Sequence, residues 1–205
     1  MRNKGQMFLI ASIIIIAVLI LLKTSINLPE IIQQKIELEG RFDREFFASI
    51  VDEMPKVIEI SYHQQDNITN NIFDFFNFTI KKMDERSLDF ETLFVDSITP
   101  KETGVVTMNV TLINLLKKSI NATLILDGSI KNQDNIADMT AWYTDFTVTQ
   151  GENYTLTVSY NETYQENITI NTYSEKSRYI AFFDITIESL RETYKDKFQK
   201  SYTLP

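Results

Sequence analysis

The chain has 205 residues, enough for one ordinary domain with additional segments. Hydrophobic residues make up 43% of the chain and charged residues 23%, a composition that excludes an intrinsically disordered protein. There is no cysteine and one histidine, which excludes disulfide scaffolds, thiolate zinc sites, cysteine nucleophiles and multi-histidine metal sites. The net charge of −8 has the wrong sign for a general nucleic-acid binder.

Near its start the chain carries an uncharged apolar run of 16 residues, Met7–Leu22, which follows the basic residues Arg2 and Lys4. A helix of this length spans about 24 Å, somewhat less than the hydrocarbon core of a bilayer. Because Lys23 can extend to the interface, the run predicts a transmembrane helix within an anchor segment, residues 1–26. Positive charge ahead of this helix favours a cytoplasmic amino terminus and an extracellular remainder. The alternatives are a buried core helix and a cleaved secretory signal.

The tripeptide Lys4-Gly5-Gln6, directly ahead of the run, resembles the class III signal of archaeal type IV pilin-like proteins. The resemblance covers about the first 22 residues. It implies that a prepilin peptidase cuts between Gly5 and Gln6 and leaves the apolar helix attached, to pack with other pilin-like subunits. Many members carry Glu five residues into the mature chain, where this sequence has Ile10. An uncleaved signal anchor is the alternative.

Seven Asn-x-Thr sequons follow the predicted anchor, more than chance would place there. Their acceptors are Asn67, Asn77, Asn109, Asn121, Asn153, Asn161 and Asn167. Glycosylation of an extracellular chain explains them, because the glycan is added on the translocated side. The alternative is structural: residues i and i+2 share the solvent face of a strand, so polar faces generate such sequons without glycosylation.

The segment 27–88 has the pattern of amphipathic helices. Asn27 followed by Pro29 predicts a helix start, and apolar residues then recur mostly at four-residue spacing. Pro55 is expected to kink or end this helix, because proline cannot donate the i to i−4 hydrogen bond. The Pro29 signal also implies a break from the membrane helix, where pilins usually have one continuous rod.

A second helix is predicted over Asn67–Met83, with Asp66 as a candidate cap. It carries an aromatic and aliphatic stripe at steps of three and four residues, which indicates core packing rather than a ligand site.

The segment 89–205 changes to a period of two from Val105 onward. Apolar and polar residues alternate over 106–112, 121–126, 146–149, 154–160, 167–171 and 179–187. With a first strand at Phe90–Ile98 and turns such as Asp127-Gly128, these segments predict antiparallel sheets with one face on a core. We expect two facing sheets in an Ig-like β-sandwich, since no helix within this half is available to cover a single sheet. The tail, Arg191–Pro205, is expected to form an edge strand or a flexible end.

The sequence has no recognisable catalytic constellation, so we expect no catalytic, cofactor-binding or metal-binding residues. His63 lies in a polar stretch at a helix end and is expected to be exposed. The stretch Lys131–Asp138 offers oxygen ligands without the spacing of an EF-hand, and is expected to be a solvated loop. Trp142 beside Tyr143 is compatible with a sugar-stacking surface, although a core tryptophan is favoured. Carboxylates brought together from distant strands leave an extracellular hydrolase open.

Together these features predict an α+β protein with an anchor at 1–26, a helical region at 27–88 and a β-sandwich at 89–205. We expect a non-enzymatic, single-pass, membrane-anchored cell-surface glycoprotein that is pilin-like and contributes to a surface filament. Its partners would be the lipid bilayer and other pilin-like subunits, with no nucleic acid and no cofactor. The alternative is a membrane-tethered extracellular binding or adhesion module that does not polymerise.

Overall fold

The computed structural model describes residues 12–21, 23, 28–64, 67–172, 177–189 and 192–203. The chain divides into two compact units, residues 1–45 and 46–205.

In the first unit, residues 12–21 are helical and helix α2 (Leu28–His63) begins one residue before Pro29, which confirms the predicted helix start. None of the helices formed by the described residues has both the length and the hydropathy needed to cross a membrane. Residues 7–11 and 22 of the predicted anchor helix lie outside the described residues, as do Gly5 and Gln6.

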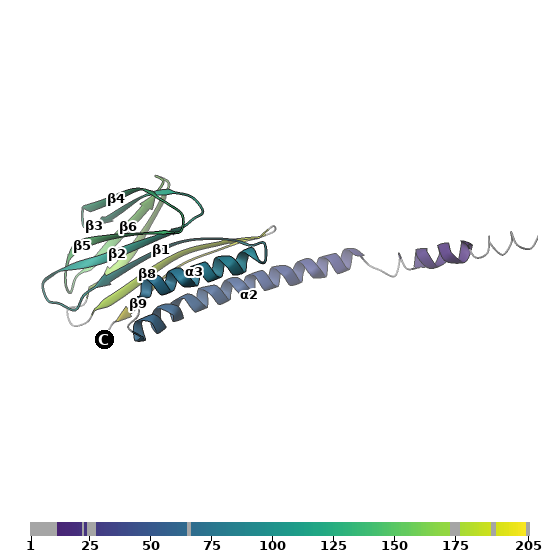
Figure 1. The fold of residues 1–205 in the computed structure, drawn as a ribbon, viewed down its shortest axis with the longest axis horizontal. Coiled ribbons are helices and arrows are strands. Elements are labelled where there is room, and N and C mark those ends of the chain that lie inside the picture. Colours follow the sequence, from purple (N-terminus) through teal and green to yellow (C-terminus); the bar gives the residue numbers. More distant parts are fainter. Residues whose placement is uncertain are drawn as a thin grey trace, which may run out of the picture. The chain divides into compact units, whose positions relative to one another are not determined.

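The described part of the second unit is built on two antiparallel sheets (Figure 1). Their strands are β1 (Asp89–Thr99), β2 (Val105–Leu115), β3 (Ile120–Leu126), β4 (Ser129–Ile136), β5 (Thr140–Thr149), β6 (Asn153–Tyr160), β7 (Tyr164–Asn171), β8 (Arg178–Glu188) and β9 (Thr193–Thr203). The order is β5-β2-β1-β8-β9 in the five-stranded sheet and β4-β3-β6-β7 in the four-stranded sheet. Every strand pair is antiparallel, as the alternating sequence pattern predicted.

The two sheets face each other across an inter-sheet core, which confirms the predicted β-sandwich. Leu112 of the five-stranded sheet and Leu124, Leu156 and Ile168 of the four-stranded sheet belong to this core, and the first three are completely buried. The residues next to them in sequence are mostly polar. The buried face of these strands can therefore be predicted from the two-residue period of the sequence.

Helices from the preceding segment, outside the half that the sequence pattern assigned to the sandwich, cover the other face of the five-stranded sheet. Helix α3 (Ile68–Asp84) and the part of α2 from Phe46 onward form a helix-side core with β1, β2, β8 and β9. Phe76 of α3 is completely buried and packs against Phe90 and Phe94 of β1. Figure 1 shows α3 lying along this sheet. The apolar stripe of α3 was predicted to pack in a core, and it does so against the five-stranded sheet.

The core shared by helices and sheet explains why the boundary between the two compact units lies between residues 45 and 46. The segments derived from the sequence separated a helical region ending at residue 88 from a sandwich starting at 89. Because the helices from Phe46 onward bury their apolar faces on the sheet, they belong to the same unit as the strands, and the division lies at 45/46.

Strand β4 occupies most of the stretch that was expected to be a solvated loop. The preceding turn at Asp127 (φ 46°) and Gly128 (φ 78°), which the sequence did predict, returns the chain antiparallel to β3. The side chains of β4 are mostly exposed, as is usual for an edge strand. Backbone pairing rather than side-chain propensity makes this polar segment a strand.

The helix boundaries differ from the expectation in two places. Asn67, not Asp66, caps α3: its Oδ1 accepts a hydrogen bond from the backbone N–H of Asn70 at 3.1 Å, and Asp66 lies outside the described residues. Of the two outcomes expected at Pro55, a kink or an end, the end does not occur, because helix α2 continues to His63. The carbonyl of Pro55 accepts a hydrogen bond from the Tyr202 hydroxyl of β9 at 3.2 Å, which ties this part of α2 to the sheet.

Candidate functional site

Four of the seven predicted acceptors lie in or beside the four-stranded sheet, and all four side chains are exposed. Asn121 is in β3, Asn153 begins β6, Asn161 directly follows β6 and Asn167 is in β7. Residues next to them along the strands, such as Ala122 beside Asn121 and Ile168 beside Asn167, face the inter-sheet core. The four acceptors therefore lie on the outer face of the sandwich.

The outer face of β6 and β7 carries only amide and hydroxyl side chains. Its cross-strand pairs are Asn153–Asn171, Thr155–Thr169, Thr157–Asn167 and Ser159–Gln165. Thr157 Oγ1 donates a hydrogen bond to Asn167 Oδ1 at 2.9 Å. A face without charged or large apolar side chains is hydrated, and it is not a hydrophobic docking surface.

Several acceptor amides also have a structural role, through their oxygen atoms. Asn161 Oδ1 accepts from the backbone N–H of Asn121 at 3.1 Å, and Asn121 Oδ1 accepts from that of Asn135 at 2.9 Å. An N-linked glycan is attached at Nδ2 and leaves the carbonyl oxygen as an acceptor. The structural and the glycan-acceptor interpretations of these asparagines are therefore compatible.

The other three sequons are less accessible because their threonines contribute to the folded core. Thr79, of the Asn77 sequon, is 2% exposed and donates to the Phe75 carbonyl inside α3. Thr111, of the Asn109 sequon, is buried beneath the helices. Asn67 is the α3 cap, and the hydroxyl of its Thr69 donates to Asp96 Oδ2 at 3.3 Å.

A cleft of about 640 Å³ opens where β3 begins and β6 turns into β7. It is lined by both acceptors Asn121 and Asn161 and by Tyr160 and Tyr164. The rings of these two tyrosines stack with centroids 4.3 Å apart on the inner face of β6 and β7, where they pack against the inter-sheet core. Burial raises the pKa of Tyr160 to about 12, so its hydroxyl stays protonated at neutral pH.

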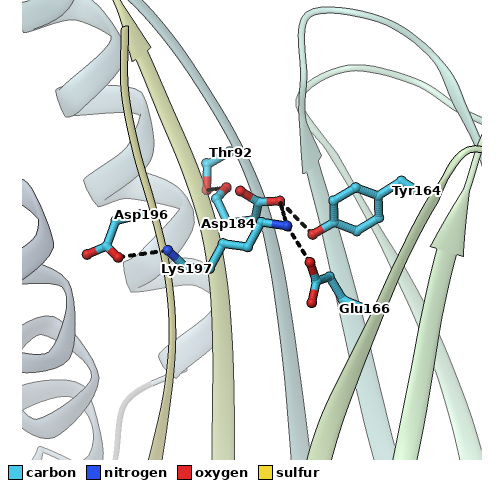
Figure 2. A network of polar contacts seen from close by, with 6 residues as sticks. All are labelled: Thr92, Tyr164, Glu166, Asp184, Asp196 and Lys197. Atoms are coloured by element: carbon cyan, nitrogen blue, oxygen red, sulfur yellow. Dashed lines mark hydrogen bonds and ion pairs between the residues drawn. The ribbon is translucent and has the colours of Figure 1, made fainter.

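A polar network joins the two sheets beside this cleft (Figure 2). The Tyr164 hydroxyl of β7 donates to Asp184 Oδ2 of β8 at 2.5 Å. Lys197 of β9 forms an ion pair with Glu166 of β7 and lies 3.5 Å from Asp184 Oδ2. Burial, the hydrogen bond to Asp184 and the nearby carboxylate charge raise the pKa of Tyr164 far above its usual range. Lys197 offsets part of the charge of the two carboxylates, and the neutral Tyr164 hydroxyl donates a hydrogen bond to one of them, so the network holds β7 against β8 and β9.

Gln199 of β9 strengthens the same edge. Its side-chain amide donates to the carbonyl of Thr169 at 2.6 Å and accepts from the Thr169 N–H at 3.3 Å. Both backbone groups face away from the four-stranded sheet, at the free edge of β7. Their pairing removes a template for further strand addition.

Asp96 is a buried acid on the helix side of β1. It is 1% exposed, and its Oδ2 accepts from the Tyr179 hydroxyl at 3.0 Å as well as from Thr69. Burial raises its pKa to about 6, although the hydrogen bonds it accepts act in the opposite direction. Nothing in the sequence pattern marked Asp96 as functional, and the available signal was a single acid within the apolar run of β1.

The remaining predicted positions lie apart from this region. His63 is the last residue of α2 and is exposed, as expected, with its ring tilted against Tyr62 at 5.7 Å. Trp142 is half-buried and packs against the inter-sheet core, whereas Tyr143 is 63% exposed. No group of three or more acidic or histidine side chains among the described residues is arranged to hold a metal ion.

Comparison with known proteins adds no relative. Neither a family model, nor a curated protein, nor a solved structure matches this chain.

Proposed function

We propose that the chain is a non-enzymatic, single-pass, membrane-anchored cell-surface protein with an extracellular, glycosylated β-sandwich. It is pilin-like, and its apolar helix packs with other pilin-like subunits in a surface filament. The sandwich is an Ig-like display domain that presents the uncharged outer face of β6 and β7 to the environment. No cofactor takes part.

The observation that carries this proposal is the surface of the amino-terminal helix. In residues 12–21 the Ile, Leu and Val side chains are between 49% and 64% exposed. A helix that is apolar on every side and uncovered is unstable in water, and needs lipid or protein around it. The basic residues ahead of it favour insertion with the rest of the chain outside.

The accessible acceptors support the extracellular placement independently. Four exposed Asn side chains on one sheet have their sequon threonines at the surface or half-buried. The transfer of glycans takes place on the outer side of the membrane. Membrane topology and acceptor placement were derived from different residues, and both lead to the same compartment.

Processing at Gly5–Gln6 is the specifically pilin-like part of the proposal. Intact-mass measurement of the mature protein tests it: a chain that begins at Gln6 supports pilin-type export. A retained Met1 or Arg2 contradicts it and leaves a simple signal anchor.

The absence of cysteine allows a direct test of topology. Ser129 is exposed in β4, so a Ser129→Cys variant provides a single reactive thiol. We expect a membrane-impermeant maleimide to label this variant in intact cells as completely as in permeabilised cells. Labelling only after permeabilisation, with wild-type chain as the unlabelled control, would contradict surface display.

A second candidate is the tethered module that does not polymerise. The helix-start signal at Asn27 and Pro29 favours it, because pilins usually form one continuous rod. Ile10 in place of Glu favours it too. Imaging of purified surface material separates the candidates, since subunits that line a filament exclude the module and dispersed monomers exclude the filament.

A further inference from the structure

Strand β9 is an edge of the five-stranded sheet. Among the described residues it pairs only with β8, in a regular ladder from Thr193 to Thr203 that contains no proline. In an antiparallel ladder every second residue directs its N–H and C=O away from the partner strand, so β9 keeps a row of backbone groups unpaired within the sheet. A long, regular edge of this kind is a template for a further strand.

The sequence of β9 is nearly symmetric about Phe198. Residues 193–203 read Thr-Tyr-Lys-Asp-Lys-Phe-Gln-Lys-Ser-Tyr-Thr. When two copies are placed antiparallel with Phe198 opposite Phe198, threonines lie opposite each other at both ends, with tyrosine opposite tyrosine one position further in. Asp196 lies opposite Lys200 of the second copy, and two-fold symmetry makes this pair occur twice. No two like charges are directly opposite in this register.

The neighbouring registers are less favourable. Residues that face the helices must stay on the same side of the sheet in both copies, so the register can change only in steps of two residues. A register centred on Lys197 places two lysines opposite each other. A register centred on Gln199 places Asp196 opposite Tyr202 and separates it from Lys200. The charges therefore select the register centred on Phe198.

The side chains that this pairing needs are accessible. Asp196 and Lys200 lie on the helix side of β9, where Asp196 is half-buried and Lys200 is exposed. Figure 2 shows Asp196 on the side of β9 opposite to the inter-sheet network. The other helix-side residues of the strand are half-buried aromatic residues, Tyr194, Phe198 and Tyr202. A second strand along this edge would cover their exposed parts.

Antiparallel pairing also determines how the two chains run. Phe47 of α2 stacks on Tyr194 at the start of β9, with ring centroids 5.8 Å apart. Further along α2, the Pro55 carbonyl accepts from the Tyr202 hydroxyl near the end of β9. This part of α2 therefore runs in the same direction as β9. In an antiparallel pair the two chains enter the joined sheet from opposite ends, as chains from two facing surfaces would.

We propose that β9 is a homophilic contact site, at which two copies of this chain on facing surfaces pair their β9 edges antiparallel about Phe198. The strand pairing is argued from the described residues alone, whereas the facing surfaces rest on the membrane anchor of the proposed function. Each copy contributes one strand, so the interface is small and the dilute chain is monomeric. Many copies on each surface make the contact stable through multivalency.

Charge reversal tests the partner and the register together. The full-length chain is reconstituted in lipid vesicles, and light scattering measures the clustering of the vesicles. Asp196→Lys and Lys200→Asp each place like charges opposite each other when identical chains pair. Mixing vesicles that carry one variant with vesicles that carry the other restores both ion pairs. Asp145→Lys and Lys118→Asp make the same charge changes at exposed positions away from β9 and are the matched controls.

We expect wild-type vesicles to cluster, and each β9 variant alone to reduce clustering at least about tenfold, because like charges opposite each other in an interface cost several kcal/mol. The mixture of the two variants should cluster as wild type does, and so should both controls. The fluorescence of the single tryptophan, Trp142, verifies that each variant is folded.

Disulfide formation gives a second readout of the register, because the chain has no cysteine of its own. Thr193→Cys and Thr203→Cys are placed at exposed positions on separate vesicles, and the thiols are oxidised by oxygen with a copper catalyst. The mixture should give a disulfide-linked dimer. Vesicles of one kind should not, since equivalent positions of the two copies lie roughly 33 Å apart in this register.

The outcomes that overturn the inference differ from those that overturn the proposed function. Clustering that the charge reversals leave unchanged, or that does not return in the mixture, overturns the pairing at β9. Wild-type vesicles that do not cluster also overturn it, and the lysines of β9 then protect the edge. These results leave surface display intact. A chain that is unlabelled at Ser129→Cys in intact cells overturns the proposed function, whereas a disulfide between Thr193→Cys and Thr203→Cys chains in detergent would still support the strand pairing.

Discussion

Asp96 shows how a single buried acid makes stability depend on pH. Its usual pKa of 3.8 rises to about 6 in the folded protein. Between these values the unfolded chain is ionised at this position while the folded protein keeps the proton, so the free energy of unfolding falls as pH rises. The difference is roughly 3 kcal/mol over the whole window. Above about pH 6 the folded protein carries a buried carboxylate that only neutral donors stabilise.

Asp96→Asn should remove this dependence, because the amide keeps an acceptor oxygen for Tyr179 and Thr69 and has no charge to bury. We expect the stability of the variant relative to wild type to improve by about 1–3 kcal/mol between pH 4.5 and pH 7.5. Urea denaturation at both pH values measures it. The exposed-acid variant Asp145→Asn corrects for net charge, and an equal change in both variants would mean that Asp96 has no special role.

Tyr164→Phe should weaken the polar contact between β7 of one sheet and β8 of the other. The substitution removes only the hydroxyl that donates to Asp184, and leaves the ring stacked on Tyr160. A hydrogen bond to a charged acceptor contributes about 1.5–3 kcal/mol, so we expect a loss of that order in the free energy of unfolding. Tyr143→Phe, at an exposed position of β5, is the control and should be neutral. Equal stability of the two variants would exclude a stabilising role for the network in Figure 2.

Helix α3 and the second half of α2 pack on the five-stranded sheet, so the helical segment and the strand segment form one folded unit. Phe76→Ala removes a ring that is completely buried between α3 and β1. We expect a loss of about 3–5 kcal/mol, a large share of the stability of an ordinary domain. Phe78, two residues further along the same helix, is 58% exposed. Phe78→Ala should therefore lower the free energy of unfolding by less than about 1 kcal/mol. Chemical denaturation of both variants measures this, and similar losses would mean that α3 does not dock as described.

Elements with a clear apolar period were predictable, because burial on one side leaves a mark on the sequence. Val106, Met108, Val110 and Leu112 alternate with polar residues, and all four lie in the inter-sheet core. The edge strand β4 was not predictable in this way, since both of its faces are mostly exposed. Helix α2 continues through Pro55 because packing of its apolar face outweighs one missing hydrogen bond.

The candidate site was predictable only in part. The seven sequons can be read directly from the sequence, including Asn161 with its flanking Tyr160 and Tyr164. Which threonines are buried, and which acceptors share one face, depends on long-range pairing that the sequence pattern does not specify. The stacking of the two tyrosines follows from the tight turn that places them opposite each other across β6 and β7.

At the scale of the whole molecule, the division at 45/46 decides which piece of the chain can fold alone. Both cores lie within residues 46–205: the inter-sheet core, and the helix-side core to which α2 contributes Ile50, Met54 and Ile58. A chain cut before the first strand would instead leave the helix-side face of the five-stranded sheet uncovered. Phe90, Phe94 and their neighbours would then form an apolar patch of the kind that causes aggregation.

We therefore expect a fragment of residues 46–205 to be monomeric and to unfold cooperatively, with the unfolding transition of the full-length chain. The matched fragment, residues 89–205, keeps every strand but lacks the helices, and should aggregate or lose its cooperative transition because the apolar face is exposed. Size-exclusion chromatography and the fluorescence of Trp142 compare the two fragments. A soluble, cooperative 89–205 fragment would show that the sandwich is the folding unit and that the helices only rest on it.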